Sequence, residues 1–170
     1  VNIDLEEGAE VKLVMLLEPS ENGLVRHEVR AECGVNSHIH IMTIMIGRGD
    51  IYSDDHVTLS GDGARFDADA AYLGKNSQTI DYNIVADHFG KKTESLITVN
   101  GALTDSAKKV FRGTIDFKKG SADSVGSENE TVLMLGDDVV NKTVPLILCA
   151  EENVEGTHGA TIGELDADTM

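Results

Sequence analysis

The chain has 170 residues, of which 30 are acidic and 14 basic, and its formal net charge is −16. This length fits one domain around a single core, so we expect one domain over residues 1–170. The acidic excess argues against nucleic acid or an anionic membrane surface as the main partner. No apolar run approaches the ~20 residues of a membrane span and no signal segment opens the chain, which predicts a cytoplasmic protein.

Short apolar runs alternate with glycines along the whole chain. Glycines recur at Gly34, Gly47, Gly61 and Gly74, with gaps of 13, 14 and 13 residues. Runs rich in β-branched and aliphatic residues lie between such glycines, which predicts short strands bounded by turns. In chain order the predicted strands are 11–17, 38–46, 56–59, 79–86, 95–99, 113–117, 131–135 and 144–148.

Helical character is confined to two short stretches, 67–73 and 103–111. Neither has a strong cap, and glycines follow at Gly74 and Gly113. We therefore predict an all-β chain. A spacing near 13 residues fits half a coil of a flattened β-helix with about 26 residues per turn, and it fits successive strands of a sandwich equally well.

Two histidines, His38 and His40, lie on one face of a predicted strand because side chains at i and i+2 point the same way. They are a possible start of a metal site, but no third ligand follows in 41–45. A metal-dependent β-sandwich enzyme is therefore the weakest alternative, and we interpret the pair as polar residues on the solvent face of an edge strand. Asp54 and Asp55 are interpreted as solvated turn carboxylates.

The two cysteines, Cys33 and Cys149, form no Cys-x-x-Cys pair and predict reduced thiols rather than a disulfide framework. Cys33 precedes a glycine and fits a small buried residue at a strand end. Cys149 ends the apolar run 144–148 and lies nine positions before His158. A thiol and an imidazole with carboxylates between them can bind a soft or borderline metal, although purely structural roles fit both residues as well.

Several ordered motifs in the second half of the chain resemble one protein family. Residues 153–163, Asn-Val-Glu-Gly-Thr-His-Gly-Ala-Thr-Ile-Gly, match the pattern Val-x-x-x-His-Gly-Ala-Thr-x-Gly. This pattern resembles the terminal signature of the SufB/SufD scaffold proteins of SUF iron–sulfur cluster assembly. Further motifs of that family are matched upstream, in order, by His88, 93–95, 101–107 and 110–115.

The resemblance implies a right-handed parallel β-helix and a scaffold that is not an enzyme. It also implies a second SufB/SufD-type subunit, identical or different, that associates through the β-helices. A SufC-type ABC ATPase would bind helical regions outside this core. His158 matches the histidine proposed as a cluster ligand in the family, and Cys149 is a second candidate. Because one chain cannot supply four ligands, the iron–sulfur cluster is expected to be transient and shared with the partner.

Departures from the family pattern place the chain nearer to the SufD type. SufB-type members carry an acidic residue where Gly159 stands, and a ligand cysteine in the loop that corresponds to 136–142, which has none here. The helical N- and C-terminal regions of the family have no counterpart in 1–170, so we expect the ATPase to dock elsewhere. A structural partner subunit with no metal site of its own is the alternative function.

Overall fold

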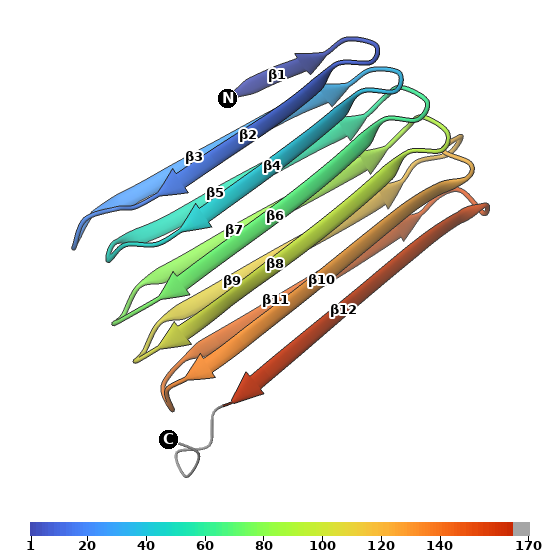
Figure 1. The fold of residues 1–170 in the computed structure, drawn as a ribbon. Coiled ribbons are helices and arrows are strands. Elements are labelled where there is room, and N and C mark those ends of the chain that lie inside the picture. Colours follow the sequence, from blue (N-terminus) through green and yellow to red (C-terminus); the bar gives the residue numbers. More distant parts are fainter. Residues whose placement is uncertain (165–170) are drawn as a thin grey trace.

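The computed structural model describes residues 1–164, and this part of the chain consists of strands and turns. The described residues hold no helix that is long and apolar enough to cross a membrane. Two six-stranded parallel sheets lie face to face (Figure 1). The first contains β1 Asn2–Leu5, β3 Leu24–Cys33, β5 Asp50–Leu59, β7 Thr79–His88, β9 Lys108–Phe117 and β11 Val140–Cys149. The second contains β2 Glu10–Leu17, β4 His38–Met45, β6 Arg65–Gly74, β8 Glu94–Thr104, β10 Ser124–Leu135 and β12 Val154–Glu164.

Each coil of the chain contributes one strand to each sheet, and successive coils pair in parallel. Glu10 pairs with His38, 28 positions on, and His38 pairs with Arg65, 27 positions on. Nearer the C-terminus, Glu94 pairs with Val125, which lengthens the coil to 31 residues. The chain is thus a parallel β-solenoid of about six coils, which confirms the all-β, parallel β-helix prediction. The coils are slightly longer than the predicted turn of about 26 residues.

The stretches with helical character are extended. The segment 67–73 lies inside β6, because Phe66, Ala68 and Ala70 point into the core while the residues between them face outward, and this period of two prevails over a short helical pattern. The segment 103–111 is divided by a turn at Asp105, where φ is +57°. Strands β1, β3 and β12 also lie outside the predicted set.

The core is a narrow layer between the two sheets. In every coil alternate residues point inward, and residues paired across coils stack into columns that run along the solenoid axis. Its largest fully buried apolar side chains include Phe66, Tyr82, Phe111 and Phe117. We call this interior the lumen; it forms one continuous apolar cluster.

One buried histidine is held by hydroxyl groups. The two ring nitrogens of His88 lie 2.7 Å from Thr93 Oγ1 and 2.9 Å from Ser95 Oγ, and the ring packs on Phe117 with centroids 4.6 Å apart. Burial lowers the pKa of His88 to about 4. The imidazole is therefore neutral at pH 7.

Replacing Ile84 with Ala is expected to lower the free energy of unfolding by about 2–5 kcal/mol, because Ile84 is fully buried and its loss leaves a cavity. The matched control is Val85→Ala, one position along β7 on the partly exposed outer face. Urea unfolding followed by circular dichroism measures both. Equal losses in the two variants would contradict the assigned inward face.

The pH dependence of stability is expected to change when His88 is replaced by Gln. Below pH about 4 both folded and unfolded states bind this proton, and above pH 6.5 neither does. Between these values the unfolded state binds more protons, so the contribution of His88 to stability rises with pH. The difference in unfolding free energy, wild type minus variant, should therefore climb from pH 4 to 6.5 and then stay flat. A flat difference throughout would contradict a neutral buried His88.

Candidate functional site

The last coil, made by β11 and β12, ends the described solenoid. β11 pairs with β9 and β12 pairs with β10, and no further described strand covers either outer edge. In Figure 1 this coil lies at the lower end of the solenoid. We call it the open end, because its inward-facing side chains have a coil on one side only.

His158 lies on the lumen side of the open end. It pairs with Glu128 of β10, whose side chain is buried in the lumen, and paired residues of parallel strands share a face. Gly156, two residues earlier, confirms the direction, because a Cβ there would approach Ile147 Cγ2 of the opposite sheet to 2.8 Å. His158 is nevertheless exposed to solvent, since no described coil covers it.

Cys149 occupies a lumen column at the same end. It is the last residue of β11 and pairs with the buried Phe117, yet it is exposed. Cys33 lies in the same column, four coils nearer the N-terminus, and is fully buried at the end of β3, as predicted. Burial raises the pKa of the Cys33 thiol to about 11, so it is unreactive at neutral pH. Both cysteines are free thiols.

Cys149 and His158 are separated along the strand direction at the open end. Gly113 faces Glu128 across the lumen, so Pro145, one coil on, faces His158. Cys149 lies four positions beyond Pro145, which corresponds to about 13 Å along the strand. The described residues contain no group of three or more His, Cys, Asp or Glu side chains able to hold a metal ion. A cluster site shared by Cys149 and His158 stays a prediction.

A buried ionic cluster lies directly behind the open end. Lys109 Nζ donates to Glu130, and it also lies 3.1 Å from Thr143 Oγ1. The Tyr72 hydroxyl donates to the same carboxylate at 3.5 Å. The Lys109 and Glu130 side chains are each 1% exposed. Burial lowers the pKa of Lys109, although its pairing with Glu130 opposes the shift.

Glu128 lies beside this cluster and has a different environment. Its Oε2 atom is buried and has no hydrogen-bond partner among the described residues. Burial, assisted by the charge of Glu130, raises the pKa of Glu128 to about 7. The sequence did not single out this residue, because the β10 segment lacks the apolar alternation that reveals an inward face.

Comparison with known proteins identifies the family. The whole chain, residues 1–170, matches the family described as SUF system FeS cluster assembly, SufBD core domain. The chain belongs to this family. It is 29% identical over 133 residues to the iron–sulfur cluster assembly protein SufD of Bacillus subtilis (strain 168). The match covers 78% of this chain and 30% of that protein, so the chain spans less than a third of its relative's length.

The histidine pair singled out in the sequence does not converge on a site in this SufBD core domain. His38 Nε2 lies 2.8 Å from Asp67 Oδ2, and His40 Nε2 lies 2.7 Å from Asp69 Oδ2. Each imidazole is thus bound by its own carboxylate on the outer face. The solvent-facing position of the two histidines is confirmed. The prediction that they lie on an edge strand is wrong, because β4 lies between β2 and β6.

The interpretation of Asp54 and Asp55 as turn residues is wrong. Both lie in β5, and Asp55 is fully buried in the lumen, where the Tyr82 hydroxyl donates to its Oδ2 at 2.8 Å. Burial raises the pKa of Asp55 to about 6. Asp54 faces outward, where hydrogen bonds from Asn83 and Arg30 outweigh the effect of burial and lower its pKa.

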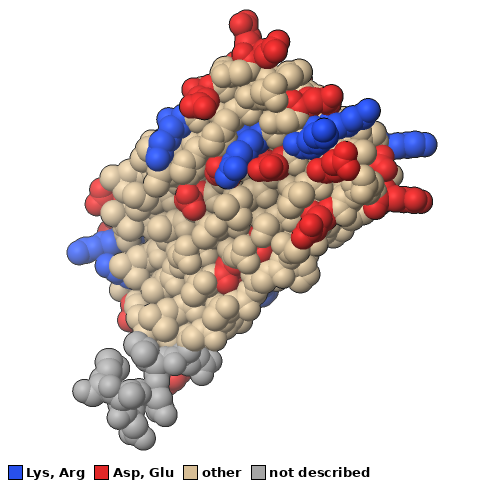
Figure 2. Space-filling model, turned by 45° about the vertical axis from the view of Figure 1, so that its right-hand side comes forward, with Lys and Arg blue, Asp and Glu red and all other residues tan. Residues whose placement is uncertain are grey.

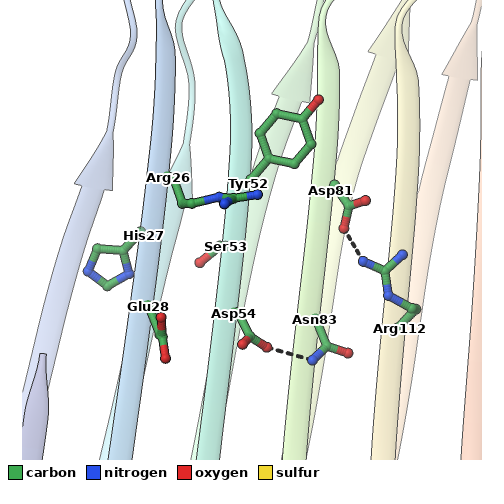
Figure 3. Close-up of a pocket in the computed structure, with 9 residues that line it drawn as sticks. All are labelled: Arg26, His27, Glu28, Tyr52, Ser53, Asp54, Asp81, Asn83 and Arg112. Carbon is green, nitrogen blue, oxygen red and sulfur yellow. Dashed lines mark hydrogen bonds and ion pairs between the residues drawn. The ribbon is translucent and has the colours of Figure 1, made fainter.

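A polar depression of about 530 Å³ lies on the outer face of the first sheet (Figure 3). Arg112 is paired with Asp81 across its floor, and Asn83 donates to Asp54 at 2.6 Å. The polar side chains of these two pairs therefore bind one another. The depression includes neither Cys149 nor His158, so it is separate from the site that the family signature indicates.

The buried pair offers a test of the lumen next to the open end. Glu130→Ala is expected to cost about 3–5 kcal/mol of unfolding free energy, because it leaves the Lys109 ammonium buried without its counter-charge. The double variant Lys109→Met/Glu130→Leu should recover most or all of this loss. Thermal and urea unfolding measure both. A loss below about 1 kcal/mol in Glu130→Ala, the range of exposed pairs, would contradict a desolvated pair.

Proposed function

We propose that this SufBD core domain is a non-catalytic scaffold in iron–sulfur cluster assembly and that its open end supplies part of a nascent cluster site at a subunit interface. The observation that carries the proposal is the position of His158. This residue of the family signature lies on the lumen side of the last coil, where its imidazole remains accessible because no described coil covers it. A ligand offered there can be completed by a second subunit that closes the open end.

The donor chemistry supports this assignment. Iron–sulfur clusters are held mainly by thiolates and accept imidazole ligands. The open end offers the imidazole of His158 and, about 13 Å along the strand direction, the thiol of Cys149. One chain therefore leaves most cluster ligands to a partner. We assign His158 as the primary ligand and Cys149 as a secondary one, with the cluster as cargo rather than a permanent cofactor.

The surface of the last coil suits a protein partner. β11 and β12 each have an outer edge that no described strand pairs, and such edges readily accept further strands. The outward stripe of β11, formed by Val144, Leu146 and Leu148, is 52%, 47% and 42% exposed. Figure 2 shows charged side chains gathered over the upper part of one face and a largely uncharged surface over the lower part of that face. We propose a second SufB/SufD-type subunit as the occupant.

Other partners follow from the same proposal. A SufC-type ATPase would dock outside this β-helical domain. The net charge of −16 disfavours nucleic acid and anionic membranes as partners, and we assign the complex to the cytoplasm.

A structural role without metal is the second candidate. It is favoured by one observation, that the described residues gather no three metal ligands in one place. In that case the open end would serve only to bind the partner subunit. The experiment below separates the two functions.

Anaerobic reconstitution with iron and sulfide tests the proposal. The protein is mixed with its SufB/SufD-type partner, and cluster formation is followed by visible absorbance. His158→Ala should weaken cluster binding by at least about 10–100-fold, the effect seen when even an outer-shell partner of a metal ligand is lost. Cys149→Ser should have a smaller effect.

The matched control is His56→Ala, which removes an outer-face imidazole paired with Asp87 at 2.7 Å. Size-exclusion chromatography of the same mixtures reports whether the two subunits still associate. Intact association with unchanged cluster loading in His158→Ala would remove His158 from the ligands. Association without any cluster in the wild type would favour the structural role.

A further inference from the structure

The column of lumen residues that contains His158 changes from apolar to polar side chains at its C-terminal end. From the N-terminal coil onward its first four members are apolar, and the last two are an acid and an imidazole. The members are Leu13, Ile41, Ala68, Ile97, Glu128 and His158. Metal-binding donors therefore occur in this column only in the two coils nearest the open end.

Glu128 is buried without an evident structural purpose. Its side chain is 2% exposed, and Oε2 has no hydrogen-bond partner among residues 1–164. Leaving a buried polar atom without a partner costs about 1–3 kcal/mol, and more for a charged group. Glu130, two residues on, shows that this lumen can satisfy a carboxylate, because Lys109 and Thr143 bind it. Glu128 is thus an available oxygen donor in the wall of the lumen.

The opposite sheet leaves room for the Glu128 carboxylate. Gly113 faces it, and a Cβ at that position would lie 2.0 Å from Oε2. Any larger residue would collide with the carboxylate. The glycine therefore maintains the space that the Glu128 side chain occupies across the lumen.

Glu128 and His158 are neighbours across the last strand pair. Paired residues of adjacent strands are about 4.8 Å apart along the hydrogen-bonding direction, and both side chains point into the lumen. Bonds from a first-row metal ion to nitrogen or oxygen donors measure about 2.0–2.2 Å. One metal ion can therefore be bound by two donors at once. One is an oxygen of Glu128, one coil further inside the solenoid, and the other is the imidazole of His158 in the last described coil.

We propose that Glu128 and His158 together form a two-donor site for a divalent first-row metal ion at the mouth of the lumen. A carboxylate and an imidazole suit borderline ions such as Fe(II), Co(II) and Zn(II). Two protein donors leave coordination positions open toward the opening, where sulfide or a partner's ligands bind. That the ion in the cell is Fe(II) rests on the proposed function, whereas the pairing of the two donors rests on geometry alone.

Co(II) serves as the probe, because its visible absorbance reports bound imidazole and carboxylate ligands. The purified protein, without partner or sulfide, is titrated anaerobically with Co(II). The wild type should give a saturable band, and Glu128→Gln and His158→Ala should each weaken binding by about 10–100-fold or more. Saturating Co(II) should also raise the unfolding temperature of the wild type and not of either variant.

Two matched controls isolate the site. Glu155→Gln changes an exposed carboxylate of β12, and His56→Ala changes an outer-face imidazole. Both should bind Co(II) as the wild type does. Because His158 is exposed at the end of the solenoid, its removal leaves the fold intact and the test remains decisive if Glu128→Gln is poorly folded.

Wild-type affinity in Glu128→Gln, or the absence of a saturable band in the wild type, would overturn the two-donor site. These results are distinguishable from a failure of the proposed function. If cluster reconstitution depends on His158 but Glu128→Gln changes neither Co(II) binding nor cluster loading, the scaffold function stands and the two-donor site is rejected. If Co(II) binding requires both residues but no cluster forms with a partner, the site stands and the scaffold function fails.

Discussion

Each strand of this solenoid aligns with the strand one coil away, so that side chains at paired positions stack in columns along the axis. This in-register parallel pairing satisfies the backbone hydrogen bonds of each strand from its neighbours. It also decides which residues are hidden, because a shift of one position would turn every inward side chain outward. The location of His158 above Glu128 is a direct result of the register.

The same constraint explains why charged groups occur inside a thin apolar core. The lumen admits a polar side chain where a nearby side chain offers a partner, as Tyr82 of the next coil does for Asp55 and Lys109 of the same coil does for Glu130. These partners are 27 and 21 positions apart in the sequence but adjacent in space. Some buried polar atoms have no partner among the described residues, and Oε2 of Glu128 is one of them. Glu128 lies next to the last described coil.

The sequence predicts the fold class well and the site partly. Aliphatic runs between glycines indicate most strands, but β3 alternates charged with apolar residues and β12 contains three glycines, so neither has the apolar run of a typical strand. The spacing of glycines could not separate a solenoid from a sandwich, because both repeat a strand and a turn at similar intervals. The family motifs made that distinction.

The candidate site could be predicted from the sequence only in part, because its residues are brought together by the register of the coils. Cys149 and His158 are near in sequence. They lie in opposite sheets, however, on either side of a turn, and are separated along the strand direction. Glu128 is 30 positions from His158, and only the coil register makes the two residues neighbours. Local patterns do not contain that register.

The open end also has a consequence for folding cooperativity. Each strand makes most of its contacts with the strands one coil before and after it, so the solenoid behaves as a one-dimensional chain of units coupled to nearest neighbours. Among the described residues the last coil has a single such neighbour and can open locally at a lower free energy than the middle coils. Local opening can therefore be confined to β11 and β12, while the remaining described coils stay folded as a support.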